Sequence, residues 1–217
     1  MKIDIVSDTI CPWCYIGKRK LEAALTSRPD LAVEVTWHPF QLNPDMPEGG
    51  ADRKSFTARK FGSIERAREI YDNIKNAGQD VDLEFNFHKI ERTPNTLDSH
   101  RLIRWAYTAG CQDAVVEILF RRYFMEGEDI GDPAILIEAA KEAGMDFELV
   151  GELLAKDSDK DLVRSEDMKV REMGINGVPL FILGERFALS GAQDPSVFHR
   201  AFDRLAELDA KENGAES

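Results

Sequence analysis

Residues 2–14 read KIDIVSDTICPWC, and this stretch decides the fold. Residues 2–7 alternate between polar and branched apolar side chains, which is typical of a β-strand. After the CPWC sequence, apolar residues recur at helical spacing to about residue 28, before a proline. Alternation returns in residues 32–39. The sequence therefore predicts a strand, a helix and a second strand, with the CPWC sequence at the start of the helix.

The middle of the chain changes to a helical pattern. Turn-forming residues at 43–50 mark the boundary. Residues 81–87 alternate with period two, which indicates either an extended connector along a groove or a surface loop. We expect helices over residues 53–77, from an N-cap at Thr93 and Pro94 onward, and over residues 112–126, 133–143, 147–156 and 159–173.

The end of the chain returns to strands. Residues 178–183 and 187–190 flank a tight turn and predict a hairpin, which Asp194 and Pro195 follow as the start of a last helix. Because neither end has enough strands to be stable alone, we expect both ends to share one sheet. This order predicts an α/β, thioredoxin-like fold with an inserted all-helical domain. The thioredoxin-like domain would comprise residues 1–44 and 157–217, and the helical insertion residues 45–156.

The composition excludes several classes of protein. The chain has 217 residues, 43% of them hydrophobic and 31% charged, which is typical of a globular domain. Its net charge of −12 disfavours nucleic acids and anionic membranes as partners. No apolar run reaches the roughly 18 to 20 residues of a membrane-spanning helix, and the first residues do not resemble a signal peptide. We therefore expect a cytoplasmic protein, in which thiols are usually reduced.

Cys11 and Cys14 have three possible roles. A zinc site would need two more ligands at a suitable spacing, and none is evident, so no metal is predicted. A structural disulfide closing so short a loop would stabilise the fold by only about 2 kcal/mol. A redox pair fits the position, because CxxC after a strand and at the start of a helix is a strong signal of thiol-disulfide chemistry.

The residues of the CPWC sequence suit that redox role. Unpaired N–H groups and the positive end of the helix dipole would stabilise a thiolate on Cys11. Cys14, one turn further, would resolve the mixed disulfide formed on Cys11. Pro12 suits the first helical turn because it has no N–H to leave unpaired. Trp13 offers an apolar rim that could contact a peptide.

Val178 and Pro179 form a second feature that fits the redox pair. Pro179 stands immediately before a predicted strand, where proline is tolerated. An ordinary trans proline at a strand start is one interpretation. Beside a CxxC pair we favour a cis bond, which would turn the Val178 backbone outward so that it could pair with an extended substrate.

Five segments of the chain match one family. They are Asp8-x-x-Cys11-Pro12-Trp13-Cys14-Tyr15-x-Gly17, PFQLNP at residues 39–44, Pro94-Asn95-Thr96-x-x-x-His100-Arg101, Gly177-Val178-Pro179 and Gly191-Ala192-Gln193. In these segments the chain resembles the DsbA-like thioredoxin family, and in particular its FrnE-like branch. The resemblance extends from Lys2 to about Leu208. It implies that Cys11 attacks, that Cys14 resolves and that Pro179 is the cis-proline.

Relatives of this architecture include the 2-hydroxychromene-2-carboxylate isomerases and the kappa-class glutathione transferases. They carry serine where this chain has Cys11 and bind glutathione without forming a disulfide. By that analogy, Val178 would pair with the glutathione backbone, and Gln193 or Asp194 would meet its γ-glutamyl end. Asp194 could equally be only a helix cap, and Asn95 could line the cleft or only start its helix.

The favoured function is a cytosolic thiol-disulfide oxidoreductase that acts on protein thiols and disulfides or on glutathione. No tightly bound cofactor is implied, although glutathione could be a co-substrate. The protein would be a monomer or a homodimer. One alternative is a glutathione-dependent transferase or isomerase, and another is a holdase-like module that binds peptides. A third cysteine, Cys111, follows Gly110 at a helix start and could be partly reactive or buried and inert.

Overall fold

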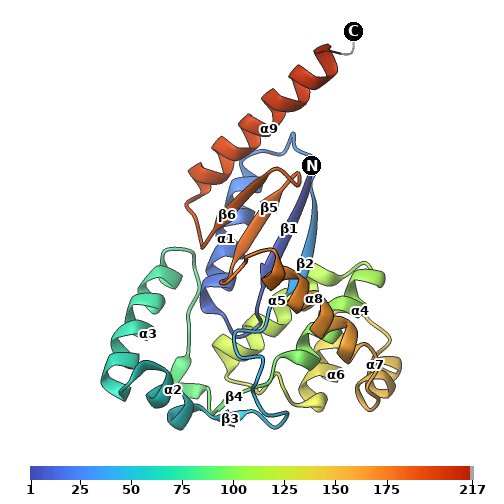
Figure 1. Ribbon diagram of the computed structural model, residues 1–217. Helices are drawn as coiled ribbons and strands as arrows, with labels where there is room; N and C mark the ends of the chain where they lie inside the picture. The colour runs from blue at the N-terminus through green and yellow to red at the C-terminus, as the bar shows by residue number, and fades with distance from the viewer. Residues whose placement is uncertain (216–217) are drawn as a thin grey trace.

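A four-stranded sheet joins the two ends of the chain (Figure 1). The computed structural model describes the backbone of residues 1–215 and the side chains as far as residue 212. The strand order is β2-β1-β5-β6, in which only β1 and β2 are parallel. The prediction that both ends share one sheet is therefore confirmed. The strands are β1 (Lys2–Ser7), β2 (Glu34–Pro39), β5 (Leu180–Leu183) and β6 (Phe187–Ser190).

Two helices pack together beside this sheet. Helix α1 (Pro12–Thr26) connects β1 to β2, and α9 (Pro195–Ala215) contacts it and projects beyond the sheet (Figure 1). Phe181 of β5 touches both helices, because its ring lies 5.0 Å from that of Phe198 and also packs over Gly17. A Cβ on Gly17 would lie 2.9 Å from Phe181 Cζ, so this close packing of α1 on β5 requires glycine.

The remaining elements form the helical part of the molecule. Helices α4, α5 and α8 contact β2, whereas α3 contacts α1 and packs against α2 on the other side of α1 (Figure 1). The elements, in chain order, are β3 (Ala51–Asp52), α2 (Arg53–Phe61), α3 (Ile64–Gln79), η1 (Phe87–Lys89), β4 (Arg92–Thr93), α4 (Leu97–Thr108), α5 (Gln112–Arg121), the π-helical turn η2 (Arg122–Glu126), α6 (Pro133–Glu142), α7 (Phe147–Leu154) and α8 (Lys160–Glu172).

The single helix expected over residues 53–77 is wrong. Gly62 adopts a left-handed conformation with φ of 86° and ends α2. Ser63 then caps α3, because its side chain accepts a hydrogen bond from the Arg66 N–H at 3.1 Å. The helical periodicity continues across this break, which is why the pattern alone did not reveal it.

The start expected for the next helix is also wrong. Thr93 pairs with Ala51 in the short β3-β4 ladder, and α4 begins only at Leu97. Asn95 rather than Thr93 supplies the side chain that pairs with a backbone N–H at the start of α4, since its Oδ1 accepts a hydrogen bond from the Leu97 N–H at 2.9 Å. Residues 81–87, for which an extended connector and a surface loop were both possible, bury the side chains of Leu83 and Phe85. This segment therefore lies against the helices rather than on the surface.

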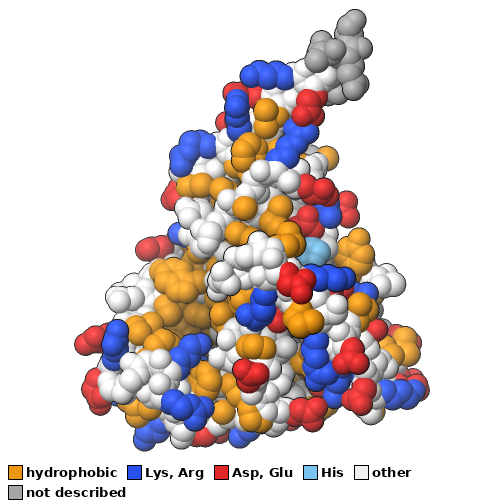
Figure 2. Space-filling model, in the orientation of Figure 1, with side chains coloured by type: hydrophobic (Ala, Val, Ile, Leu, Met, Phe, Trp, Pro, Cys, Tyr) orange, Lys and Arg blue, Asp and Glu red, His pale blue; other side chains and the backbone are white. Residues whose placement is uncertain are grey.

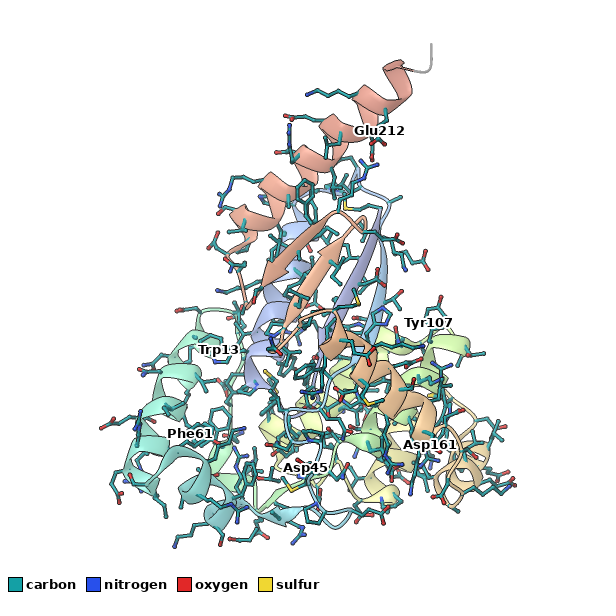
Figure 3. The ribbon with its side chains drawn as sticks, viewed as in Figure 1. Trp13, Asp45, Phe61, Tyr107, Asp161 and Glu212 are labelled. Carbon is teal, nitrogen blue, oxygen red and sulfur yellow. The ribbon has the colours of Figure 1, made fainter. Side chains whose placement is uncertain are left out.

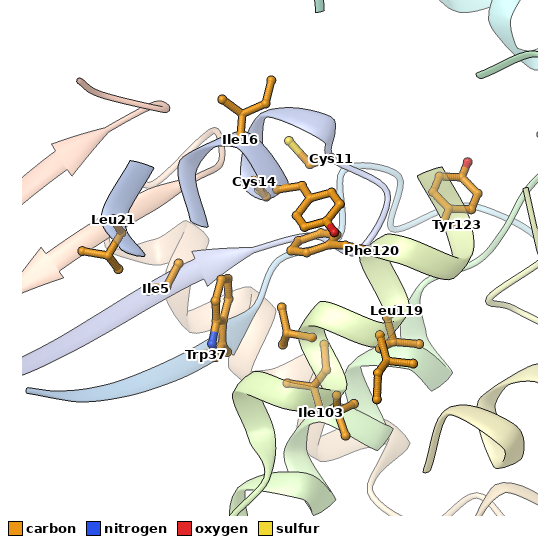
Figure 4. Packing of buried hydrophobic residues seen from close by; sticks show 14 of the residues in the cluster. Ile5, Cys11, Cys14, Ile16, Leu21, Trp37, Ile103, Leu119, Phe120 and Tyr123 are labelled. Atoms are coloured by element: carbon orange, nitrogen blue, oxygen red, sulfur yellow. The ribbon is translucent and has the colours of Figure 1, made fainter. Parts of the chain in front are cut away.

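Buried hydrophobic side chains from the sheet and the helical part form one cluster (Figure 4). Within it, Tyr15 of α1 stacks on Phe120 of α5 at 4.9 Å, and Trp37 of β2 meets the same ring edge-on at 6.4 Å. The residue boundaries expected for the thioredoxin-like domain and the helical insertion stay predictions. None of the helices described in residues 1–215 combines the length and the apolar character needed to span a bilayer.

Candidate active site

Cys11 and Cys14 lie at the first turn of α1 (Figure 4). Cys11 is the N-cap, with the extended backbone angles φ −95° and ψ 108°, and Pro12 is the first helical residue. The Cys14 N–H donates to the Cys11 carbonyl at 3.0 Å, and the Cys11 N–H donates to the Asp8 carbonyl at 3.0 Å. Both cysteines are free thiols. The two sulfur-bearing residues therefore share one tight turn at the positive end of a helix.

The two thiols differ in their surroundings. Cys11 is 4% exposed, whereas Cys14 is completely buried. Burial raises the pKa of Cys14 well above its usual value, and its hydrogen bond and charge interaction with Cys11 raise it further. The side chain of Ser7 and the backbone of Asp8 oppose this shift but do not overcome it. Cys14 is therefore held as a neutral thiol beneath Cys11.

The Val178–Pro179 segment packs beside Cys11. The peptide bond between these residues is cis, and the Cys11 thiol donates to the Val178 carbonyl across 3.7 Å. Pro179 is buried against α1, with its Cγ 3.1 Å from the position of a Cβ on Gly17. Trp13 is 41% exposed at the end of α1 that faces α3 (Figure 3). The structure thus brings Cys11, Cys14, Val178 and Pro179 together and leaves the Trp13 ring accessible to a partner.

Helix α4 supports the turn that precedes Cys11. Asp8 is fully buried, and its Oδ2 accepts a hydrogen bond from the Leu42 N–H at 2.6 Å. Its Oδ1 lies 3.4 Å from Nε2 of His100, another buried side chain. The hydroxyls of Thr9 and Ser99 share a buried hydrogen bond of 2.8 Å. Ser99 of α4 therefore holds the loop that carries the cysteines by a hydrogen bond, and His100 of the same helix lies beside Asp8.

Lys60 of α2 is a site residue that the sequence did not indicate. It is exposed to solvent, yet partial desolvation lowers its pKa, while negative charge at Asp8 and Cys11 acts in the opposite direction. The Lys60 ammonium therefore lies within electrostatic range of the Cys11 sulfur. No local pattern links α2 to the CPWC sequence, because the charge interaction joins two helices that are far apart along the chain.

Three residues expected to bind substrate use their polar groups within the fold. Asn95 donates to the Met46 carbonyl at 2.6 Å, and Gln193 donates to the Ser190 carbonyl at 2.7 Å. Asp194 accepts a hydrogen bond from the Ser196 N–H at 2.9 Å, which makes it a cap of α9 and lowers its pKa. Their roles toward a substrate stay predictions. Cys111 is half-buried, and burial raises the pKa of its thiol.

The sequence and the geometry agree with a known family. The family of DSBA-like thioredoxin domains matches residues 2–203. The chain belongs to this family. This DsbA-like protein is similar to a probable DsbA oxidoreductase from Streptomyces coelicolor, with 32% identity, a TM-score of 0.85, and coverage of 94% of this chain and 89% of that one. The thioredoxin-like fold with a helical insertion is thereby confirmed, and so is the class of thiol-disulfide oxidoreductase.

Two further relatives of the DsbA-like protein extend the comparison. The uncharacterized protein YwbO of Bacillus subtilis (strain 168) is 27% identical over 200 residues, which are 92% of this chain and 94% of YwbO. The cytosolic disulfide reductase DsbM from Pseudomonas aeruginosa, solved with GSH, has the same fold at 16% identity. Its TM-score is 0.66, and the match covers 95% of this chain and 100% of that one.

Proposed function

We propose that the protein exchanges disulfides through its CPWC pair, with Cys11 as the attacking and Cys14 as the resolving thiol. The observation that carries this proposal is the asymmetry of the pair. Cys11 lies at the helix terminus beside the Val178 carbonyl, whereas Cys14 is completely buried and the pKa of its thiol is raised. A thiolate is the nucleophile in this chemistry, so the thiol at the helix terminus is the one equipped to attack first.

The exchange consists of two displacements. The Cys11 thiolate attacks one sulfur of a substrate disulfide, so that a Cys11–substrate bond forms while the other substrate sulfur leaves as a thiolate and takes up a proton. Cys14 then loses its proton and attacks the Cys11 sulfur, which releases the second substrate thiol. The substrate is reduced by two electrons and the Cys11–Cys14 pair is oxidised by two. The same steps in reverse oxidise a dithiol.

The substrates we propose are protein disulfides or glutathione disulfide, in the cytoplasm. The exposed ring of Trp13 and the Val178 backbone, which lies beside Cys11, support contact with an extended polypeptide. The DsbM structure supports a cytosolic setting and glutathione, since that protein is a cytosolic disulfide reductase solved with GSH. Glutathione would act as a co-substrate rather than as a resident cofactor.

Insulin reduction tests this proposal when the three cysteines are replaced one at a time. With glutathione as the electron donor, we expect Cys11→Ser to abolish turnover of insulin disulfides. Cys111→Ser is the matched control and should retain the wild-type rate, because Cys111 is the N-cap of α5, outside the CPWC turn. Turnover of insulin disulfides that survives the loss of Cys11 would overturn the proposal.

A further inference from the structure

A cavity between α2, α3 and residues 85–91 is lined by residues other than those of the redox centre. It has a volume of about 730 Å³ and lies on the side of the molecule where α2 and α3 pack together (Figure 1). None of Cys11, Cys14, Val178 and Pro179 lines it. Its volume falls within the roughly 300 to 1,000 Å³ of sites for small organic ligands.

One face of α3 and the buried connector give the cavity an apolar interior. Ile64 and Tyr71 come from α3, and Phe85, Phe87 and Ile90 come from the connector. The Tyr71 ring lies 4.7 Å from Phe87, and Phe87 lies 5.2 Å from Phe85, so the aromatic wall is continuous. Such a wall fits the apolar body of a ligand rather than a hydrated ion.

A buried hydroxyl in the cavity lining has no partner. Thr57 of α2 is 8% exposed, and its Oγ1 makes no hydrogen bond with any described residue. A buried hydroxyl left without a hydrogen-bond partner is energetically unfavourable. A ligand that brings an oxygen to this point would therefore recover part of that cost.

Four cations border the same cavity without a carboxylate partner. Lys54, Arg68 and Lys75 form no ion pair among the described residues, and Arg53 donates to the neutral hydroxyl of Tyr71 at 2.6 Å. Several arginines elsewhere do face carboxylates, as in the contacts Arg101–Asp98, Arg122–Glu128 and Arg171–Asp167.

The acidic residues of the lining do not cancel this charge. Asp52 is occupied as the cap of α2, where it accepts a hydrogen bond from the Ser55 N–H at 2.8 Å, which leaves Asp72 and Glu91 at the rim. Residues 53–79 hold seven Lys or Arg and three Asp or Glu, in a chain whose net charge is −12. Figure 2 shows Lys and Arg side chains over this part of the surface.

We propose that this cavity binds an organic carboxylate with an apolar body. The apolar body lies against Phe85, Phe87 and Ile64, and the carboxylate faces Arg68 and Lys75 with the Thr57 hydroxyl as a further partner. Charge complementarity selects the carboxylate, because the cations lack anions of their own. This site goes beyond the redox function and does not depend on it.

Binding of 4-phenylbutanoate and of its neutral amide, 4-phenylbutanamide, tests the proposal. The two probes share the apolar body and differ in charge. Isothermal titration of the full chain should show the carboxylate binding at least about tenfold more tightly than the amide at low ionic strength. Equal affinities for the two probes, or no binding of the carboxylate, would overturn the proposal.

Substitutions locate the site and separate it from the redox centre. Arg68→Gln and Lys75→Gln change exposed side chains. Each should lower the affinity for the carboxylate several-fold without lowering the affinity for the amide. Arg164→Gln, on the exposed surface of α8, is the matched control and should leave both affinities unchanged. Cys11→Ser should also leave them unchanged, so failure of the redox proposal and failure of this one give different results. Weakening by Arg164→Gln equal to that by Arg68→Gln would indicate nonspecific attraction and contradict the site.

Discussion

The two cysteines of one turn differ in their surroundings, since Cys11 is 4% exposed and Cys14 is completely buried. In the proposed exchange, replacing Cys14 by alanine removes the thiol that would release a mixed disulfide from Cys11. We expect Cys14→Ala to accumulate adducts with glutathione or with protein thiols in cells. Cys11→Ala should accumulate few, because burial raises the pKa of Cys14 and disfavours its thiolate. Acid quench followed by non-reducing mass spectrometry measures the adducts on both variants.

The comparison between these two variants decides the assignment. Adducts on Cys14 in Cys11→Ala at the level found on Cys11 in Cys14→Ala would mean that burial does not control which thiol attacks. An absence of adducts on both variants would contradict a covalent intermediate. The Cys111→Ala variant is the internal control, since both CPWC cysteines remain and no trapping is expected.

Lys60 is a second single residue that we expect to affect Cys11, in this case through its charge. A positive charge nearby stabilises a thiolate, so Lys60→Gln should slow alkylation of Cys11 by iodoacetamide at pH 7 by about two- to fivefold at low salt. The difference should shrink as ionic strength rises. The measurement uses a Cys111→Ser background, so that only the CPWC thiols react.

Lys54→Gln is the matched control for Lys60→Gln. It removes a cation from the same helix, and Lys54 is likewise exposed. If the effect is specific to the position of Lys60, Lys54→Gln leaves the rate close to that of the background. Equal slowing by both substitutions would attribute the effect to the general field of α2 and would contradict a local role for Lys60.

Contacts between elements hold α1, and with it the cysteines, against α5. Lys18 of α1 is buried and lies 3.2 Å from Glu117 of α5, whose carboxylate also accepts a hydrogen bond from the Tyr15 hydroxyl at 2.7 Å. Burial alone would raise the pKa of Glu117, but hydrogen bonds from Arg19 and Tyr15 and the charges of Lys18 and Arg19 lower it. The ionised form of Glu117 therefore stabilises the contact between the two helices.

We predict that Glu117→Gln lowers the free energy of unfolding by about 1 to 3 kcal/mol at pH 7. A lowered pKa means that the stabilisation is complete above the unfolded value of about 4.3 and is lost as pH falls through the lower folded value. The difference in the free energy of unfolding between wild type and Glu117→Gln should therefore narrow below about pH 4. Urea titrations at several pH values measure this difference.

Glu126→Gln provides the surface control for this pair of helices. Glu126 pairs with Arg121 on the exposed side of α5 and η2, where an ion pair contributes about 0 to 1 kcal/mol. A loss of stability from Glu126→Gln as large as that from Glu117→Gln would show that burial does not explain the effect of Glu117→Gln. If the difference in the free energy of unfolding between wild type and Glu117→Gln stays constant down to pH 3, it would contradict the lowered pKa of Glu117.

The sequence predicts elements well where a local signal is strong. The strand at residues 2–7 and the helix behind the CPWC sequence follow directly from periodicity and from Pro12 at the first turn. It fails at the break between α2 and α3, because the periodicity runs through Gly62. It also fails at Thr93, which is used by the β3-β4 ladder. The charge interaction of Lys60 with Cys11 has no local signal, since the two residues lie on helices that are far apart along the chain.

At the scale of the whole molecule, the charge is unevenly distributed. The net charge of −12 predicts weak attraction for nucleic acids, yet α2 and α3 together carry more cations than anions. At physiological ionic strength, exposed charges act over only about 8 Å, so a small anion near α2 responds to the local excess of cations rather than to the net charge. Composition averages over these regions and cannot reveal the difference between them.

The continuous core leads to a prediction for unfolding. Side chains of the sheet and of the helical part pack in one cluster, as Trp37 of β2 and Phe120 of α5 do. The Trp37 backbone also makes two hydrogen bonds with the Gln112 side chain. Its carbonyl accepts one from Nε2 at 3.1 Å, and its N–H donates the other to Oε1 at 2.9 Å. Disrupting either part exposes apolar surface of the other, which couples their stabilities. We therefore expect one cooperative transition in urea.

Two single-tryptophan variants measure whether the parts unfold together. Trp13→Phe/Trp105→Phe retains Trp37 in β2, and Trp13→Phe/Trp37→Phe retains Trp105 in α4. Within each variant, the fluorescence transition should coincide with the far-ultraviolet circular dichroism transition, even though the substitutions themselves shift the midpoint. Dichroism that falls in two steps, with Trp37 reporting one and Trp105 the other, would show that the helical part unfolds independently of the sheet. Coincidence of both probes would mean that the shared core, rather than the linear arrangement of the segments, sets the unit of folding.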